Sequence, residues 1–368
     1  MTGTDARNRA AVVTAFGEPL EITEIALREV RAGEVLVRLE YAAVCITDVY
    51  ASNGSTRSIP PFVTGHAATG IVHEVGPGVR TLAVGDRVSI TGTTECGVCD
   101  FCLKGTPGAC AEVFEQGPRP IGTLPDGREV VVEGGIGAYL QWNVYREGTV
   151  VRLSPELDPV QAALFGCGIS SGLGAVLSVA EVQTGATVAI NGAGHLGLWM
   201  LQGARLANAS RIIVVEPDPR RRAIAAGLGA TDIVDPADGD PVAQVKALTD
   251  RGRGVDYSFE AVGTGAAMAQ AFAMSRNGGT TVATGMRARG DTVELNVLDF
   301  AIRAKRVMSS QTGGGAIHRD IPRWDRLLRE GRIDPSPIVS EVFPLDRIND
   351  AFAAAVARDV LTGIIDLR

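Results

Sequence analysis

The 368-residue sequence has no excess of positive charge and no apolar stretch at its start. Lysine and arginine total 35 against 42 aspartates and glutamates, which gives a net charge of -7. A nucleic-acid surface needs clustered basic residues, so we expect no nucleic-acid partner. Residues 1–10 carry Asp5, Arg7 and Arg9 without an apolar core, so we expect no secretory signal and a cytoplasmic location.

The segment from Pro159 to Ala180 has no charged residue and is long enough to span a bilayer. Its composition includes four glycines, three serines and a proline, which suits a buried turn and helix better than a lipid-facing span. The sequence therefore predicts no membrane association.

Two patterns divide the chain, whose length exceeds one ordinary core. From Ala11 to Val151, short apolar runs alternate with turn residues, which predicts a β-rich domain. After Val160, apolar strands alternate with Ala-rich helical stretches, which predicts βαβ units and a doubly wound parallel sheet. The tail combines a helix near 322–330, a helix at 346–358 and a closing strand at 363–367. We predict one domain from 1–167 with 310–368, and a second from 168–309.

A glycine-rich loop follows the apolar strand at 187–191 and leads into an apolar helix, the context in which a GxGxxG motif binds a dinucleotide. The glycines permit a tight turn and close approach to a pyrophosphate, and the helix N-terminus supplies partial positive charge. A similar loop also occurs in α/β folds without a cofactor. The loop residues predicted to bind the cofactor are Gly192, Gly194, His195, Leu196 and Gly197.

Glu216 ends the next strand, where a carboxylate can hydrogen-bond the adenosine ribose. It would repel the 2′-phosphate of NADP, so the sequence favours NAD. Arg220, Arg221 and Arg222 follow closely and soften that preference.

Four of the six cysteines form a C-x2-C-x2-C-x7-C pattern. Four thiolates this close can surround one zinc ion and leave no open position, which is typical of a structural site. Bacterial ferredoxins share the first spacings but end with a shorter gap and a Cys-Pro, whereas Ala111 follows the last cysteine here. The predicted structural zinc ligands are Cys96, Cys99, Cys102 and Cys110.

Cys45, His66 and Cys167 are the remaining candidates, far apart in the sequence. Three such ligands plus water would make a catalytic zinc site with an open position. Taken singly, each would more often be a buried structural cysteine or a core histidine.

From Ala11 to Leu367, the residues resemble the zinc-containing alcohol dehydrogenases of the medium-chain dehydrogenase/reductase superfamily. The resemblance implies an α/β chain with a β-rich GroES-like catalytic domain and a Rossmann cofactor domain. The motifs that carry it are Cys45-Ile46-Thr47-Asp48, Gly65-His66-Ala67-Ala68-Thr69-Gly70, Gly166-Cys167-Gly168, the four-cysteine loop, GAGHLG and Gly254-Val255-Asp256-Tyr257-Ser258-Phe259-Glu260.

The resemblance also implies roles for individual residues. The catalytic zinc is held by Cys45, His66 and Cys167, Asp48 orients His66, and Thr47 accepts the alcohol proton. Hydride then passes between the alcohol and NAD, with an aldehyde or ketone as the other partner. Arg221 is expected to help bind NAD, and Ser171 and Val262 match positions that line its nicotinamide end.

Several positions depart from the family pattern. Ala67 replaces a glutamate that can serve as an alternative ligand, and Ile46 and Thr362 replace basic residues that contact the pyrophosphate, so we expect moderate NAD affinity. Tyr50 replaces a histidine of the proton relay; a phenol titrates near pH 10, so we expect protons to leave through water. Gly92 replaces an aromatic residue, which suggests room for a bulky or aromatic alcohol.

The main hypothesis is a zinc-dependent, NAD-linked alcohol dehydrogenase with two zinc ions per chain. The alternatives are a reductase of polarised C=C bonds, an enzyme that keeps NAD permanently bound, and a non-enzymatic zinc- and NAD-binding scaffold. The resemblance and the long connection from Ala111 to Gly137 favour a homo-oligomer, with a dimer preferred.

Overall fold

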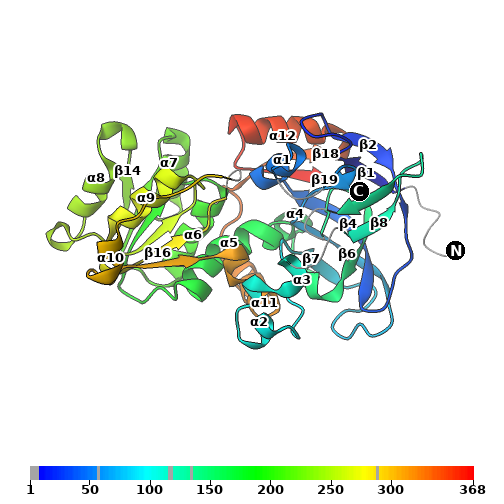
Figure 1. Ribbon diagram of the computed structural model, residues 1–368, viewed down its shortest axis with the longest axis horizontal. Helices are drawn as coiled ribbons and strands as arrows, with labels where there is room; N and C mark the ends of the chain where they lie inside the picture. Colours follow the sequence, from blue (N-terminus) through cyan, green and yellow to red (C-terminus); the bar gives the residue numbers. More distant parts are fainter. Residues whose placement is uncertain (1–7, 56–58, 115–118, 133–135, 287–289) are drawn as a thin grey trace. The chain divides into compact units, whose positions relative to one another are not determined.

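The computed structural model describes residues 8–55, 59–114, 119–132, 136–286 and 290–368 (Figure 1). Contacts divide the chain into two compact units. Unit 1 comprises Met1–Cys167, Gly315–Gly331 and Ile338–Arg368, and unit 2 comprises Gly168–Gly314 and Arg332–Pro337.

The boundaries of unit 2 differ from the predicted 168–309 at the C-terminal side. The turn Gln311–Gly314 belongs to unit 2 because Gly313 packs tightly against Ser170 and Gly174, which lie in helix α5 (Ser170–Gly174). Residues 332–337 also belong to unit 2, since the Gln202 side chain exchanges two hydrogen bonds with the backbone of Asp334.

Unit 1 is built on β-sheets, which confirms the β-rich part of the predicted fold class. Its largest sheet has seven strands, six of them in the order β11-β7-β6-β4-β19-β18, with β10 also paired to β4. The strands are β4 (Glu34–Ala43), β6 (Ala68–Val75), β7 (Arg87–Ile90), β10 (Trp142–Arg146), β11 (Val150–Arg152), β18 (Val339–Pro344) and β19 (Thr362–Asp366).

Two smaller sheets complete unit 1. One pairs β1 (Arg9–Val12) with β2 (Glu21–Glu24), and the other has the order β3-β8-β9-β5. A turn at 125–127 joins β8 to β9, which pair antiparallel. The four strands are β3 (Ala26–Leu27), β5 (Phe62–Val63), β8 (Arg119–Thr123) and β9 (Glu129–Val132).

The C-terminal tail returns to unit 1, as predicted. Helix α12 (Ile348–Ala357) precedes β19, which pairs antiparallel with β4. Helix α11 (Ile317–Arg329) begins earlier than the predicted helix at 322–330, because Pro322 lies inside the helix rather than at its start. A proline there forgoes one backbone hydrogen bond but does not end this helix.

Unit 2 is a parallel sheet with the strand order β14-β13-β12-β15-β16-β17. Numbered along the chain, this order is 3-2-1-4-5-6, the order of dinucleotide-binding sheets, which place their ligand where the order reverses. In unit 2 that point lies between β12 and β15. The strands are β12 (Thr187–Asn191), β13 (Arg211–Val215), β14 (Asp232–Val234), β15 (Val255–Glu260), β16 (Ser275–Ala283) and β17 (Arg306–Ser309).

The helices of unit 2 alternate with its strands. α6 (His195–Leu206) follows β12, α7 (Pro219–Gly227) follows β13, and α9 (Gly265–Met274) follows β15. Two further helices are α8 (Pro241–Ala247) and α10 (Val297–Ala301). This alternation confirms the predicted βαβ pattern.

The uncharged segment that could cross a membrane by length is helical over Pro159–Val179. Of its most apolar window, 72% is buried inside the structure. Such burial is typical of a core helix, in agreement with the interpretation made from its glycines and serines.

Candidate metal centres and cofactor loop

Three side chains from distant segments of unit 1 meet at one point. The ligand atoms of Cys45, His66 and Cys167 all lie within 4.8 Å of one another. Cys45 precedes helix α1 (Ile46–Ser52), His66 lies between β5 and β6, and Cys167 lies in a π-helical turn, Phe165–Ile169. A π-helical turn is rare and often marks a functional site. The structure thus brings together the three predicted ligands.

Asp48 fixes the orientation of His66. Its Oδ1 lies 2.8 Å from His66 Nδ1, so the other ring nitrogen, Nε2, is left for a metal. The same carboxylate accepts hydrogen bonds from the backbone amides of Cys45, at 3.0 Å, and Gly65, at 3.2 Å. The predicted orienting role of Asp48 therefore agrees with its contacts.

The charges of the three ligands suit a cation. A hydrogen bond from Cys167 lowers the pKa of Cys45 well below its ordinary value, and the same bond raises the pKa of Cys167 well above it. Burial would lower the pKa of His66, but the charge of Asp48 raises it well above its ordinary value. The Cys45 thiolate and the buried Asp48 carboxylate are balanced by His66 when its ring is protonated, and a divalent metal bound to the neutral ring would supply that positive charge instead.

Thr47 and Tyr50 both lie on α1, the helix that follows Cys45. The Thr47 hydroxyl donates a hydrogen bond to Cys45 Sγ at 3.2 Å, so its oxygen remains able to accept a hydrogen bond from another group. Tyr50 is half-buried on the same helix, three residues after Thr47. Ile46 packs against the apolar core of unit 1, and Thr362 is buried at the start of β19.

Gly92 does not open space for a substrate in the way its sequence position suggested. A Cβ built there would lie 3.0 Å from His66 Cδ2, so the absence of a side chain makes room for the His66 ring. Tyr139 is fully buried and donates a hydrogen bond to Asp48 Oδ2 at 2.6 Å. Both residues therefore pack against or hold the groups of the candidate metal site, and a bulky or aromatic alcohol remains a prediction from the sequence.

The four other cysteines form a second group in unit 1, in which all ligand atoms lie within 4.8 Å of one another. Cys96 Sγ and Cys102 Sγ are 3.9 Å apart. Zn–S bonds of about 2.3 Å in a tetrahedron place sulfurs roughly 3.8 Å apart, so the spacing fits one zinc ion. A backbone hydrogen bond from Ala111 lowers the pKa of Cys99 to about 6, while burial raises that of Cys102 to about 12.

The predicted dinucleotide loop connects β12 to α6 at the point where the strand order of unit 2 reverses. Gly192 has φ of +101°, a conformation that favours glycine, and a Cβ on Gly197 would lie 1.9 Å from the Gly192 carbonyl oxygen. Gly194 precedes α6 without a side-chain cap, and His195 and Leu196 begin the helix. The first helix amides are thus available to an anion such as a pyrophosphate.

Glu216 and Arg221 lie beside this loop. Glu216 Oε2 accepts a hydrogen bond from the Ala193 amide at 2.7 Å, which fixes the carboxylate next to the glycines. Arg221 Nη1 lies 3.8 Å from a Cβ built on Gly194, and its Nε lies 4.0 Å from Asp218 Oδ2. Arg220 also pairs with Asp218, and Arg222 pairs with Asp235. The position of the Arg221 guanidinium beside Gly194 makes it the candidate among the three arginines for contact with a ligand at the loop.

Val262 and Ser171 are placed differently. Val262 follows β15, and its Cγ2 would lie 2.9 Å from a Cβ on Gly192, so it lines the loop. Ser171 is buried in α5, whose Gly172 packs against Trp199 of α6. Val262 therefore lies against the loop, whereas Ser171 lies in a helix that packs against α6, the helix after the loop.

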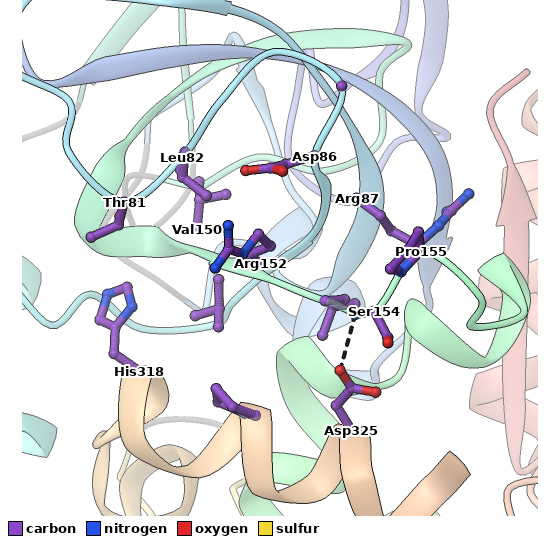
Figure 2. A pocket seen from close by; sticks show the side chains of 14 residues that line it. Thr81, Leu82, Asp86, Arg87, Val150, Arg152, Ser154, Pro155, His318 and Asp325 are labelled. Carbon is purple, nitrogen blue, oxygen red and sulfur yellow. Dashed lines mark hydrogen bonds between the residues drawn. The ribbon is translucent and has the colours of Figure 1, made fainter.

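A separate cavity of about 810 Å³ lies on unit 1 between β7, β11 and α11. Figure 2 shows Arg152 and His318 in it, and the hydrogen bond from the Ser154 amide to Asp325 at its edge. Its lining includes neither group of cysteines, so this cavity is distinct from the candidate metal centres.

Comparison with known proteins gives matches over both units. The family described as "Alcohol dehydrogenase GroES-like domain" matches residues 31–155, and "Zinc-binding dehydrogenase" matches residues 196–330. The chain is 35% identical over 355 residues to an S-(hydroxymethyl)glutathione dehydrogenase of Escherichia coli, covering 94% of this chain and 96% of that protein. The chain belongs to the zinc-containing alcohol dehydrogenase family.

Solved structures agree with this membership. An alcohol dehydrogenase zinc-binding domain protein from Burkholderia ambifaria has a TM-score of 0.93 at 30% identity, covering 99% of both chains. A benzyl alcohol dehydrogenase from Acinetobacter calcoaceticus has a TM-score of 0.91 at 28% identity, covering 99% of this chain and 100% of that one. The chain is therefore an alcohol dehydrogenase-type oxidoreductase with a GroES-like and a Rossmann-like part, as the resemblance implied.

Proposed function

We propose that this protein oxidises a primary or secondary alcohol with NAD, reversibly, at Cys45, His66 and Cys167. The convergence of these three ligand atoms beside Thr47 carries the proposal. A zinc ion there would supply a Lewis acid that lowers the pKa of an alcohol or polarises a carbonyl. NAD, the proposed hydride acceptor, would bind the loop of unit 2.

The residues of the chain supply orientation and proton transfer. Asp48 holds His66 with Nδ1 turned away from the metal, and Thr47 has its own proton directed at Cys45. The Thr47 oxygen is thereby free to accept a hydrogen bond from the hydroxyl of an alcohol and to orient it. We propose that Tyr50 does not act as the base, and that water takes the proton that the alcohol loses and carries it to solvent. Zinc-dependent alcohol oxidation requires a metal site of this kind, with a hydroxyl group beside the ligands. A zinc-binding scaffold would not require such a site.

The experiment that tests this proposal follows NADH absorbance across a panel of alcohols, with zinc analysis of the same sample. The panel includes aliphatic alcohols, benzyl alcohol and S-(hydroxymethyl)glutathione, because dehydrogenases of the last two are among the relatives. NADH formation with two zinc ions per chain would support the proposal. Saturation of an unsaturated aldehyde without alcohol oxidation would indicate a C=C reductase, and nicotinamide that stays with the purified protein would indicate a permanently bound cofactor.

We propose that Glu216 sets the preference for NAD. Its buried carboxylate lies against the loop, where it would repel a 2′-phosphate, and like charges in contact cost several kcal/mol. Glu216→Gln keeps the shape and a hydrogen-bonding oxygen but removes the charge. We expect the ratio of kcat/KM for NAD over NADP to fall about tenfold or more, which corresponds to about 1.4 kcal/mol.

Asp218→Asn is the matched control for this change. Asp218 follows two residues later, and its carboxylate is bound by Arg220, with Arg221 at 4.0 Å, and accepts no amide of the loop. In Asp218→Asn we expect the ratio of kcat/KM for NAD over NADP to stay within a factor of about two of that of the unmodified protein. This is well under the tenfold change, about 1.4 kcal/mol, expected for Glu216→Gln. Equal ratios in Glu216→Gln and the unmodified protein would show that Glu216 does not select the cofactor.

We propose that the protein forms a homodimer through the edge of unit 2. β17 is the last strand of its sheet and all four of its residues are exposed, so its backbone can pair with another strand. Pairing with the same strand of a second copy would close the interface about a two-fold axis. Val307 and Met308 are the apolar residues of this strand, and helix α10 and its C-terminal end, just before it in the chain, carry the exposed apolar residues Val297, Leu298, Phe300 and Ile302.

Val307→Lys should convert the dimer to a monomer, measured by sedimentation velocity, because it places a charge on the proposed interface. Val356→Lys is the control, since Val356 is an exposed residue of α12 outside this edge. Dissociation by both variants, or by neither, would count against the edge of β17 as the interface.

A further inference from the structure

We propose that Tyr139 positions the catalytic metal ligand His66 by holding Asp48 through the phenol hydroxyl. The inference rests on the proposed function to the extent that it requires a metal at Cys45, His66 and Cys167. It concerns a residue that lies 91 positions along the chain from Asp48 and contacts none of the three ligands through its hydroxyl.

Asp48 is a buried carboxylate whose two oxygens serve different partners. Oδ1 faces His66 Nδ1 at 2.8 Å, while Oδ2 accepts from Tyr139 Oη at 2.6 Å and from the Cys45 amide at 3.0 Å. Its side chain is 2% exposed, and no lysine or arginine of the described residues forms an ion pair with it. Besides His66, its described partners are neutral donors, and the shortest of their hydrogen bonds comes from Tyr139.

Tyr139 is itself fixed on three sides. Its carbonyl accepts from the Ala11 amide at 2.8 Å, and its ring packs edge-to-face on Phe352 of α12, with centroids 5.8 Å apart. The ring also lies 3.1 Å from a Cβ built on Gly65, the residue directly before His66. A phenol held this firmly presents its hydroxyl in one direction, so it can determine which oxygen of Asp48 faces His66.

The consequence is a chain of contacts from Tyr139 to the metal. Without the hydroxyl, Asp48 loses its shortest hydrogen bond and is held less firmly by its remaining donors, so His66 loses part of its fixed orientation. Groups that orient a metal ligand typically contribute about 10- to 100-fold to metal affinity or activity. Tyr139 would contribute to zinc retention in this way without touching the substrate or the metal.

The test compares Tyr139→Phe with Tyr145→Phe. Tyr145 is also fully buried in unit 1, and its hydroxyl donates at 2.7 Å to the Gly137 carbonyl instead of to Asp48. Each variant loses one buried phenol hydroxyl, so a general loss of stability affects both. The measurement is the rate of zinc transfer from the purified holoprotein to a coloured chelator, with the two zinc ions resolved as separate phases.

In Tyr139→Phe we expect one zinc phase to become about tenfold faster, while the phase of the four-cysteine site keeps its rate. In Tyr145→Phe both phases should keep their rates. With Co²⁺ in the catalytic site, the visible absorption bands should shift only in Tyr139→Phe, because they report ligand geometry. Equal zinc release and equal spectra in the two variants would overturn the proposal. Because these readouts require no alcohol, a protein that retains zinc as expected but oxidises no substrate would refute the proposed function alone.

Discussion

Replacement of Cys45 by serine is expected to remove one of two zinc ions and to lower kcat/KM for alcohol oxidation by about 1,000-fold or more. A Lewis acid contributes several kcal/mol to such a reaction, and each 1.36 kcal/mol corresponds to about a factor of ten in rate. Serine has nearly the shape of cysteine but binds zinc poorly, because its hydroxyl keeps its proton. Zinc analysis and steady-state kinetics on the same sample measure both effects.

The structure predicts that this variant stays folded. Cys45 is partly exposed, and the backbone amide that anchors Asp48 is still present in serine. The thermal unfolding midpoint should therefore change by only a few degrees, since a small loss of stability shifts it by about 2–4 °C per kcal/mol in a domain of this size. Retention of two zinc ions with activity within tenfold of the unmodified protein would contradict the proposed role of Cys45.

The metal ligands could be predicted from the sequence because each lies in a short local pattern. The four-cysteine loop spans few residues, and its spacing alone indicates one tetrahedral ion. Cys45, His66 and Cys167 carry no such spacing, and only the family motifs around them predicted that they would meet. The glycine loop was predictable because its function depends on the order of strand, loop and helix, which is visible in the sequence.

The contacts that hold these groups in place could not be predicted in the same way. Tyr139 reaches Asp48 across 91 positions, and nothing near Tyr139 in the sequence marks it as a partner of a carboxylate. Gly92 carries no side chain, so its packing against the His66 ring is visible only in three dimensions. The sequence placed Gly92 near the site but could not show that it adjoins the His66 ring, because sequence position identifies a neighbourhood and not the direction in which side chains point.

For Glu216 too, the sequence predicts the neighbourhood of the side chain, and the structure shows which group it contacts. Its place at the end of β13 predicts a carboxylate near the ribose, and the structure adds that this carboxylate accepts the Ala193 amide. One oxygen is thereby engaged with the protein, which fixes the charge beside the loop whether or not a ligand is present. A fixed charge discriminates against a phosphate better than a mobile one, because it cannot swing away at low cost.

Cys110→Ser is expected to cause a large loss of stability and to leave the alcohol oxidation of the folded protein in place. This is the reverse of the result expected for Cys45→Ser. Cys110 is fully buried, and it is the last of four ligands that connect the segment 96–110. Structural zinc contributes about 10–16 kcal/mol to small zinc-dependent folds, so the loss of one ligand of four should cost several kcal/mol. At about 2–4 °C per kcal/mol, the unfolding midpoint should fall by roughly 10 °C or more.

Zinc analysis and thermal unfolding of the two variants test this division of roles together. In Cys110→Ser the remaining zinc should be the one at Cys45, His66 and Cys167, so the folded fraction should still oxidise alcohol at low temperature. In Cys45→Ser the remaining zinc should be the one in the four-cysteine site, with stability kept and activity lost. If Cys110→Ser kept both zinc ions and its unfolding midpoint, the four-cysteine group would not be a structural metal site. A loss of stability in Cys110→Ser and a loss of activity in Cys45→Ser would assign the four-cysteine group to folding and the Cys45, His66 and Cys167 group to chemistry. A general effect of removing a thiol would instead lower both stability and activity in both variants.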